Sequence, residues 1–186
     1  MRNLLLSLVS VGMVAFVAAC STEPKGQSQR QALADDSQAT LKTMEAKDPG
    51  LTDVVNNAYA YVIFPDVGKG GFVIGGAWGR GVVYEQGRMV GFAAVSEGSL
   101  GITAGGQTYA ELIVFKDESA FHKFQNGDFT IGAGASVVAL KAGAAAAAEF
   151  RNGMVVFIQN QGGLMADASI NGQKVTFHPT REFQND

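Results

Sequence analysis

The sequence predicts an α+β domain: a β-rich body, built on a strongly curved antiparallel sheet or a small barrel-like arrangement, with N-terminal helices and one helical insert. Glycine supplies 24 of the 186 residues, and only 17% of the residues are charged. Average domains have about half that glycine content and about 25% charged residues, so both departures favour packed strands and turns. Because glycine inside a strand costs roughly 0.5–1 kcal/mol, its density here indicates tight bends or closely approaching backbones.

Three helices are expected. The first runs from Ser28 to Lys47, where small apolar residues recur at helical intervals, and the run Asp48-Pro49-Gly50 ends it. A short second helix follows from Leu51 to about Tyr59. The insert covers Asp117 to Phe124, with acidic residues at its start and Asn126-Gly127 after it. These signals place helices before the sheet and once within it.

Beyond Tyr59, short apolar or alternating runs separated by glycine and polar turns are typical of strands. Gln86-Gly87 and Asn171-Gly172 are expected hairpin turns. The alanine-rich stretch Ala142–Ala148 fits either a helix, by propensity, or a connecting loop. The expected strands are Ala60–Phe64, Gly71–Trp78, Gly81–Tyr84, Met89–Val95, Tyr109–Phe115, Phe129–Val138, Met154–Gln159, Leu164–Ile170 and Val175–Phe177.

The N-terminus has the pattern of an export signal. Arg2 precedes an uncharged apolar run from Leu4 to Val17, which is too short for a spanning helix. Val17-Ala18-Ala19-Cys20 resembles the bacterial lipobox, in which the cysteine thiol takes a diacylglycerol, and the chain has no other cysteine. The residue after this cysteine is Ser21 and not Asp, and in this respect the chain resembles lipoproteins sorted to the outer membrane.

These boundaries divide the chain into four parts. They are a signal peptide over residues 1–19, a lipidated flexible tether over 20–29, a single domain over 30–180, and a C-terminal tail over 181–186. We therefore expect membrane lipid to be a partner through acylated Cys20.

Composition and spacing favour a noncatalytic protein without cofactor or metal. One cysteine and two histidines cannot form a structural zinc cluster, and a net charge of −3 argues against nucleic acid as a partner. The run Gly68-Lys69-Gly70-Gly71 lacks the spacing of a phosphate-binding loop. Glu97, Glu111 and the other carboxylates occur singly, and no spacing pairs them for acid–base chemistry.

Trp78 and Arg80 flank Gly79 near the end of an expected strand. An aromatic and a cationic side chain at that position could meet lipid headgroups, or could simply cap the sheet. Both interpretations stay open at this point.

Several motifs together resemble the SYLF domain family over about Thr52 to Phe177. Three come first: GGAWGRGVV from Gly75, GSLGITAGGQ from Gly98 and AELIVF from Ala110. FHKF from Phe121, GAGASV from Gly132 and GGLMADASING from Gly162 continue the match in the same order. The form Gly-Arg-Gly-Val-Val looks like the bacterial branch, whose members are mostly exported lipoproteins.

The resemblance implies binding to phospholipid or phosphoinositide-like headgroups, with Lys69 as a candidate contact beside Trp78 and Arg80. Eukaryotic members of this family bind phosphoinositide membranes and, in fungi, actin filaments. At Ala77 those members tend to carry arginine, so headgroup specificity does not transfer. The alternative function is a structural lipoprotein that binds another envelope or host protein, with actin-type binding disfavoured by the acidic residues between Ala32 and Val55.

Overall fold

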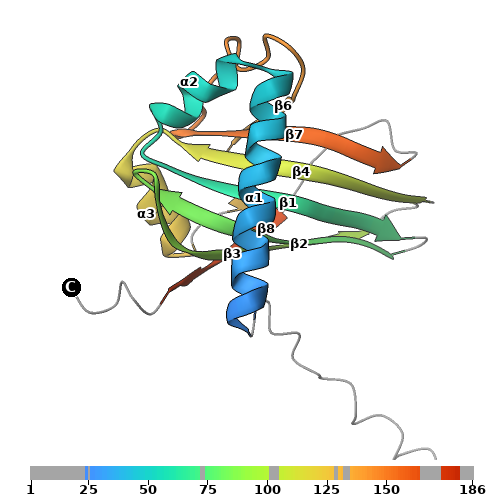
Figure 1. The fold of residues 1–186 in the computed structure, drawn as a ribbon. Coiled ribbons are helices and arrows are strands. Elements are labelled where there is room, and N and C mark those ends of the chain that lie inside the picture. Colours follow the sequence, from blue (N-terminus) through green and yellow to red (C-terminus); the bar gives the residue numbers. More distant parts are fainter. Residues whose placement is uncertain are drawn as a thin grey trace, which may run out of the picture.

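The computed structural model describes Pro24 and residues 26–71, 74–100, 105–127, 130–131, 135–163 and 173–180. Every helix, strand and core residue described lies between Pro24 and Thr180, so a chain that begins at Thr22 contains the folded domain. The elements in chain order are α1 (Gln27–Lys47), α2 (Gly50–Asn56), β1 (Ala60–Gly71), β2 (Ile74–Glu85), β3 (Arg88–Leu100), β4 (Gly105–Phe115), α3 (Glu118–Gln125), β5 (Thr130–Ile131), β6 (Ser136–Ala139), β7 (Met154–Gly163) and β8 (Gln173–Pro179) (Figure 1).

The strands form one curled sheet in the order β5-β8-β3-β2-β1-β4-β7-β6. The predicted α+β class is confirmed. The sheet is antiparallel, as expected, except at one edge, where β6 runs parallel to β7. Among the described strands, the two edges β5 and β6 do not pair with each other, so the sheet is open. Its curl is nonetheless deep, because Gln173 of β8 hydrogen-bonds Glu111 of β4 across three intervening strands.

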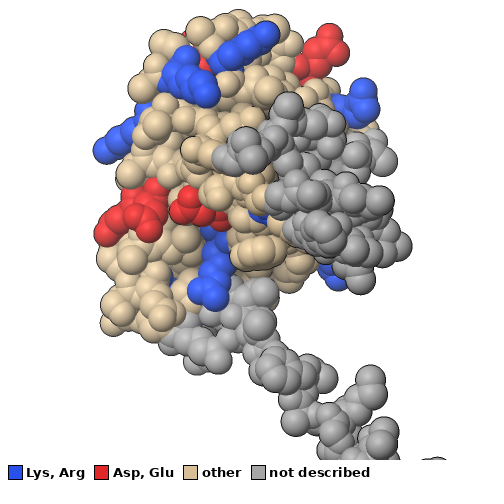
Figure 2. Space-filling model, turned by 90° about the vertical axis from the view of Figure 1, so that its right-hand side faces the viewer, with Lys and Arg blue, Asp and Glu red and all other residues tan. Residues whose placement is uncertain are grey.

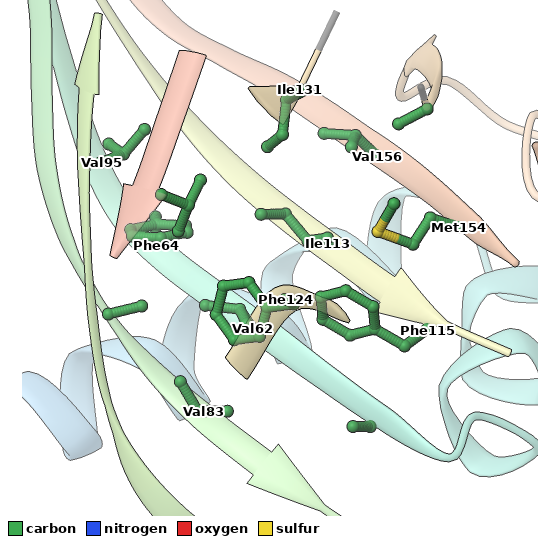
Figure 3. Packing of buried hydrophobic residues seen from close by; sticks show 14 of the residues in the cluster. Val62, Phe64, Val83, Val95, Ile113, Phe115, Phe124, Ile131, Met154 and Val156 are labelled. Atoms are coloured by element: carbon green, nitrogen blue, oxygen red, sulfur yellow. The ribbon is translucent and has the colours of Figure 1, made fainter. Parts of the chain in front are cut away.

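Both faces of the sheet are buried in its central part, and alternation along the strands, interrupted where the register shifts, divides the side chains between them. In β4, Tyr109, Ile113 and Phe115 point to the inside of the curl, which we call the inner face. Leu112 and Val114 point to the opposite, outer face. The inner core continues through Val62 and Phe64 of β1, Val83 of β2, Val95 of β3, and Met154 and Val156 of β7 (Figure 3).

The helices cover the two faces separately. Helix α1 runs across the strands on the outer face (Figure 1), from Arg30 over Phe92 of β3 to Gln38 at Tyr84 of β2. The insert α3 closes the inner face instead, where Phe121 and Phe124 pack against Phe115 and Phe177. Asp117 caps α3 by accepting a hydrogen bond from the Ala120 amide at 2.9 Å, which confirms the predicted start of this helix.

The turn at Gln86-Gly87 joins β2 to β3 as predicted, with φ of 48° and 76°. Two positive φ values are what a tight hairpin turn needs. The second helix ends at Asn56 instead of near Tyr59, because the Tyr59 amide already bonds Phe115 in the sheet. The expected strand Leu164–Ile170 and the turn Asn171-Gly172 lie outside the described residues.

Several strands are longer or more divided than predicted. The expected strand Gly71–Trp78 begins too early, because Gly71 ends β1 and β2 begins at Ile74. The expected strand Gly81–Tyr84 belongs to the same strand β2, and β1 continues past Pro65 through a bulge. The expected strand Phe129–Val138 is two strands, β5 and β6, at opposite edges of the sheet. A run of apolar residues predicts strand structure, but it does not show where the chain leaves one partner strand and joins another.

Gly79 and Gly81 show why β2 is rich in glycine. A Cβ at Gly81 would lie 2.6 Å from the Ile63 carbonyl oxygen and 2.7 Å from the Phe64 ring, and one at Gly79 would lie 2.9 Å from Val67. These positions face the inside of the curl, where the neighbouring strand approaches too closely for any side chain. The predicted strong curvature therefore has a direct structural cause.

The stretch Ala142–Ala148 is a loop of turns, which settles the choice between helix and loop. It is held against the outer core, because Ala144 and Ala145 are buried and the Ala145 amide donates to Asp48 Oδ2 at 2.7 Å. Asp48 also accepts from the Gly50 amide at 3.2 Å. These backbone donors, with Ala145 first, hold the pKa of Asp48 below its usual 3.8 despite its burial.

Candidate functional site

Trp78 lies on the outer face of the sheet, beyond the part that α1 covers. Its side chain is 64% exposed, and no other large hydrophobic residue among those described is exposed. Its indole lies over Gly68 on β1, where a Cβ would come within 3.4 Å of the ring. Glycine opposite the indole thus gives the ring a flat backbone support and leaves its outer side open to solvent.

Arg80 follows Trp78 on the same face, because alternate residues of a strand share a face. It is exposed, and the register places it opposite Asp66 of β1. A cation and a carboxylate directly opposite each other on one face attract, by roughly 0.2–1 kcal/mol. Trp78 and Arg80 therefore form one small amphipathic surface, which we call the Trp78 surface, with Asp66 at its edge.

Lys69 does not belong to the Trp78 surface. It pairs with Ala77 on one side and Gln107 on the other, and Ala77 faces the inner core. Val67, two residues before Lys69, also points inward. The three sequence-predicted lipid contacts are therefore divided: the structure brings Trp78 and Arg80 together and places half-buried Lys69 on the other side of the sheet.

Figure 2 shows the molecule from the glycine-rich end of the sheet. Basic and acidic side chains form small separate groups there on a mostly uncharged surface. An interspersed pattern of this kind gives only short-range attraction to an anionic membrane, since opposite charges cancel within about one Debye length, roughly 8–10 Å.

A polar cluster inside the curl was missed by sequence reasoning. Glu111 is fully buried, and Gln173 Nε2 donates to its Oε2 at 3.0 Å and lies 3.4 Å from the Tyr109 hydroxyl. Nearer the open end, Gln107 Nε2 donates to Asn160 Oδ1 at 2.8 Å. The sequence predicts Glu111 to be an isolated carboxylate. Its place among inward-facing apolar residues in the alternating run Tyr109–Phe115 was the available signal.

Chemically, this cluster ties strands together. It holds one carboxylate, and the described residues contain no group of three His, Cys, Asp or Glu side chains that could hold a metal ion. Acid–base catalysis on a pair of carboxylates needs two such groups facing one substrate.

The Trp78 surface has aromatic and cationic groups suited to contact with a polar–apolar boundary.

The described helices include none with the length and apolar character needed to cross a bilayer. Cys20, the predicted acylation site, lies outside the described residues, as does Ser21.

Comparison with known proteins bears on this geometry. Residues 96–182 match the family model described as Las17-binding protein actin regulator, the Ysc84 or SYLF domain. The predicted resemblance to this class is confirmed over that segment, which contains the end of β3 and every later strand.

A curated relative extends the comparison. The chain is 28% identical over 131 residues to beta cell expansion factor A of Aeromonas veronii. The match covers 69% of this chain and 49% of that relative, so the chain spans about half of the relative's length. The similarity to the SYLF family supports, at the level of the family, a domain that binds lipid or actin.

Proposed function

We propose that this protein is a noncatalytic lipoprotein, anchored to a bacterial membrane through acylated Cys20, whose domain binds lipid through the Trp78 surface. The observation that carries the proposal is the exposure of Trp78 beside Arg80 on an uncovered part of the sheet. An indole places its apolar body in the acyl region and its N–H in the headgroup region, which is why tryptophan is common at membrane interfaces.

Charge sets the strength of this contact. A cation near an anionic bilayer contributes about 1 kcal/mol. Arg80 supplies one such cation and Asp66 opposes it, so the domain alone should bind weakly and in a salt-sensitive way. Stable attachment then depends on the acyl chains. Each CH₂ group buried in the bilayer contributes about 0.8 kcal/mol to membrane binding.

The tryptophan itself reports on the proposed contact, because the chain has only one. We expect its emission to shift to shorter wavelength when the soluble form from Thr22 onward meets vesicles of mixed phosphatidylglycerol and phosphatidylcholine. Brominated acyl chains should quench it. Unchanged emission at saturating lipid, together with no sedimentation of protein with the vesicles, would reject the proposal.

The anchor is tested separately. Replacing Cys20 by Ser should abolish incorporation of labelled palmitate in cells, while an exposed-site control, Lys123→Gln, should leave it intact. Palmitate labelling that persists in the Cys20→Ser protein would show that the lipobox interpretation is wrong.

The second candidate is a domain that binds an envelope or host protein. The family description as an actin regulator that binds Las17 favours it. Absence of lipid binding in the fluorescence experiment would make it the better explanation, and the Trp78 surface would then be its first candidate interface.

A further inference from the structure

A second surface lies on the outer face, at the start of α1. It is an open groove of about 360 Å³ between the first turns of the helix and β3. Its lining residues are Gln27, Arg30, Gln31, Ala34, Met89, Phe92 and Thr180, and we call it the Arg30 groove. The floor is apolar, and the rim carries amides, a hydroxyl and one guanidinium.

Arg30 is held in place within this groove. Its guanidinium lies 5.7 Å from the centroid of the Phe92 ring, and its Nε donates to the Pro24 carbonyl at 3.1 Å. Both contacts fix the plane of the guanidinium, and a fixed planar guanidinium is suited to bidentate recognition of a phosphate. The seven lining residues are themselves not acidic, and the Asp35 carboxylate accepts a hydrogen bond from one of them, Gln31, whose Nε2 lies at 2.9 Å.

The groove is also near the predicted anchor. Cys20 is four positions before Pro24, and an extended chain spans about 3.5 Å per residue, so the chain can hold the acylated cysteine no further than about 14 Å from Pro24. Membrane attachment at Cys20 therefore brings the start of α1 and the neighbouring strand β3 to the headgroup layer (Figure 1).

From these observations we infer that the Arg30 groove binds one anionic glycerophospholipid of the anchoring membrane. Arg30 and Gln27 donate to the phosphate and the headgroup, and Thr180 Oγ1, which itself donates to the Val90 carbonyl, accepts from a headgroup hydroxyl. The glycerol end of an acyl chain covers Met89 and Phe92. The inference deepens the proposed lipid binding by giving it a headgroup site, and it rests on that function for its biological role.

The test uses the domain from Thr22 onward with its methionine methyl groups ¹³C-labelled, titrated with monomeric dihexanoyl phosphatidylglycerol. Met89 lines the groove and Met154 lies buried in the inner core, so the second methyl is an internal control. We expect the Met89 resonance to move saturably and the Met154 resonance to stay. Arg30→Gln should weaken binding at least about tenfold, because it removes the charge-assisted hydrogen bonds to the phosphate.

Arg151→Gln removes the same charge from an exposed loop and should leave the affinity unchanged. Ala34→Leu fills the floor without touching the guanidinium and should weaken binding as well, so the inference does not depend on the fold of one variant. No movement of Met89 in the wild type, or equal affinity in wild type and Arg30→Gln, would overturn the site.

Two further titrations identify the ligand. Dihexanoyl phosphatidylcholine should bind several-fold more weakly, and inorganic phosphate should not saturate at the same concentration. Equal binding of either one would overturn the assignment to an anionic lipid. If Trp78 still responds to vesicles while Met89 does not respond to the short-chain lipid, the site fails and the proposed function stands. If Met89 responds to the short-chain lipid while Trp78 does not respond to vesicles, the Trp78 surface does not bind lipid and the Arg30 groove remains the lipid site.

Discussion

Asp48 should be one of the most sensitive polar positions in the domain. It connects the end of α1 to the loop over the outer core, through hydrogen bonds from the Ala145 amide at 2.7 Å and the Gly50 amide at 3.2 Å. Hydrogen bonds to a charged group contribute about 1.5–3 kcal/mol each, and a buried amide left without an acceptor costs about as much. We expect Asp48→Ala to lower the free energy of unfolding by about 3 kcal/mol.

The pH dependence gives a second, independent signature. Because the pKa of Asp48 is lowered from 3.8 in the folded state, the unfolded state binds its proton more readily. The stabilisation by this carboxylate is therefore complete above about pH 5 and is lost as the pH falls below 3.8 toward the lowered value. Asp48→Asn should remove this part of the acid sensitivity.

Urea denaturation at pH 7 and at several acidic pH values measures both effects, with amide exchange at Ala145 as the local readout. The matched control is Asp36→Ala, an exposed aspartate on α1. The reasoning is refuted if Asp48→Ala costs no more stability than Asp36→Ala, or if the acid sensitivity of Asp48→Asn equals that of the wild type.

Three other outcomes are expected. Gly81→Ala should destabilise the domain by at least about 1–3 kcal/mol in urea, because its Cβ would meet backbone at 2.6 Å, whereas Gly162→Ala, with open space around it, should not. Gln173→Ala should cost about 1.5–3 kcal/mol, since it removes the donor to a buried carboxylate, and a loss under 0.5 kcal/mol would contradict the polar tie across the curl. Tyr61, whose burial and stacked tyrosine neighbour raise its pKa to about 12, should be missing from the ultraviolet titration step near pH 10, and Tyr61→Phe should leave that step unchanged.

Much of the fold followed from local patterns. Helix α1 ended at its predicted stop signal, and the insert α3 began at its capping residue and ended before Asn126-Gly127. The turn Gln86-Gly87 formed where two residues with positive φ separate alternating runs. These features depend on interactions between residues close in sequence, which periodicity and turn chemistry report directly.

The placement of Lys69 depended on a feature that local patterns do not report. Regular alternation from Ile63, which faces outward, would put Lys69 on the outer face with Trp78. The register of β1 shifts by one residue between Ile63 and Asp66, and Val67 faces inward as a result. One extra residue in a strand exchanges the faces of all residues that follow, which is why Lys69 is separated from Arg80.

The polar cluster inside the curl and the Arg30 groove were hidden for a different reason. Gln173 and Glu111 are 62 residues apart, and Arg30 and Thr180 lie near opposite ends of the domain. Only the curl of the sheet and the path of α1 bring them together, and neither is encoded by spacing along the chain.

Liposome flotation of the domain from Thr22 onward tests the central claim most directly. The account predicts that the wild type floats with phosphatidylglycerol-containing vesicles at low salt and less at physiological salt. Trp78→Ala and Arg80→Gln should each reduce flotation, whereas Lys69→Gln, whose side chain lies on the inner face, should float like the wild type. If the wild type floats with no anionic or zwitterionic lipid at either salt concentration, the domain does not bind membranes and the claim is wrong.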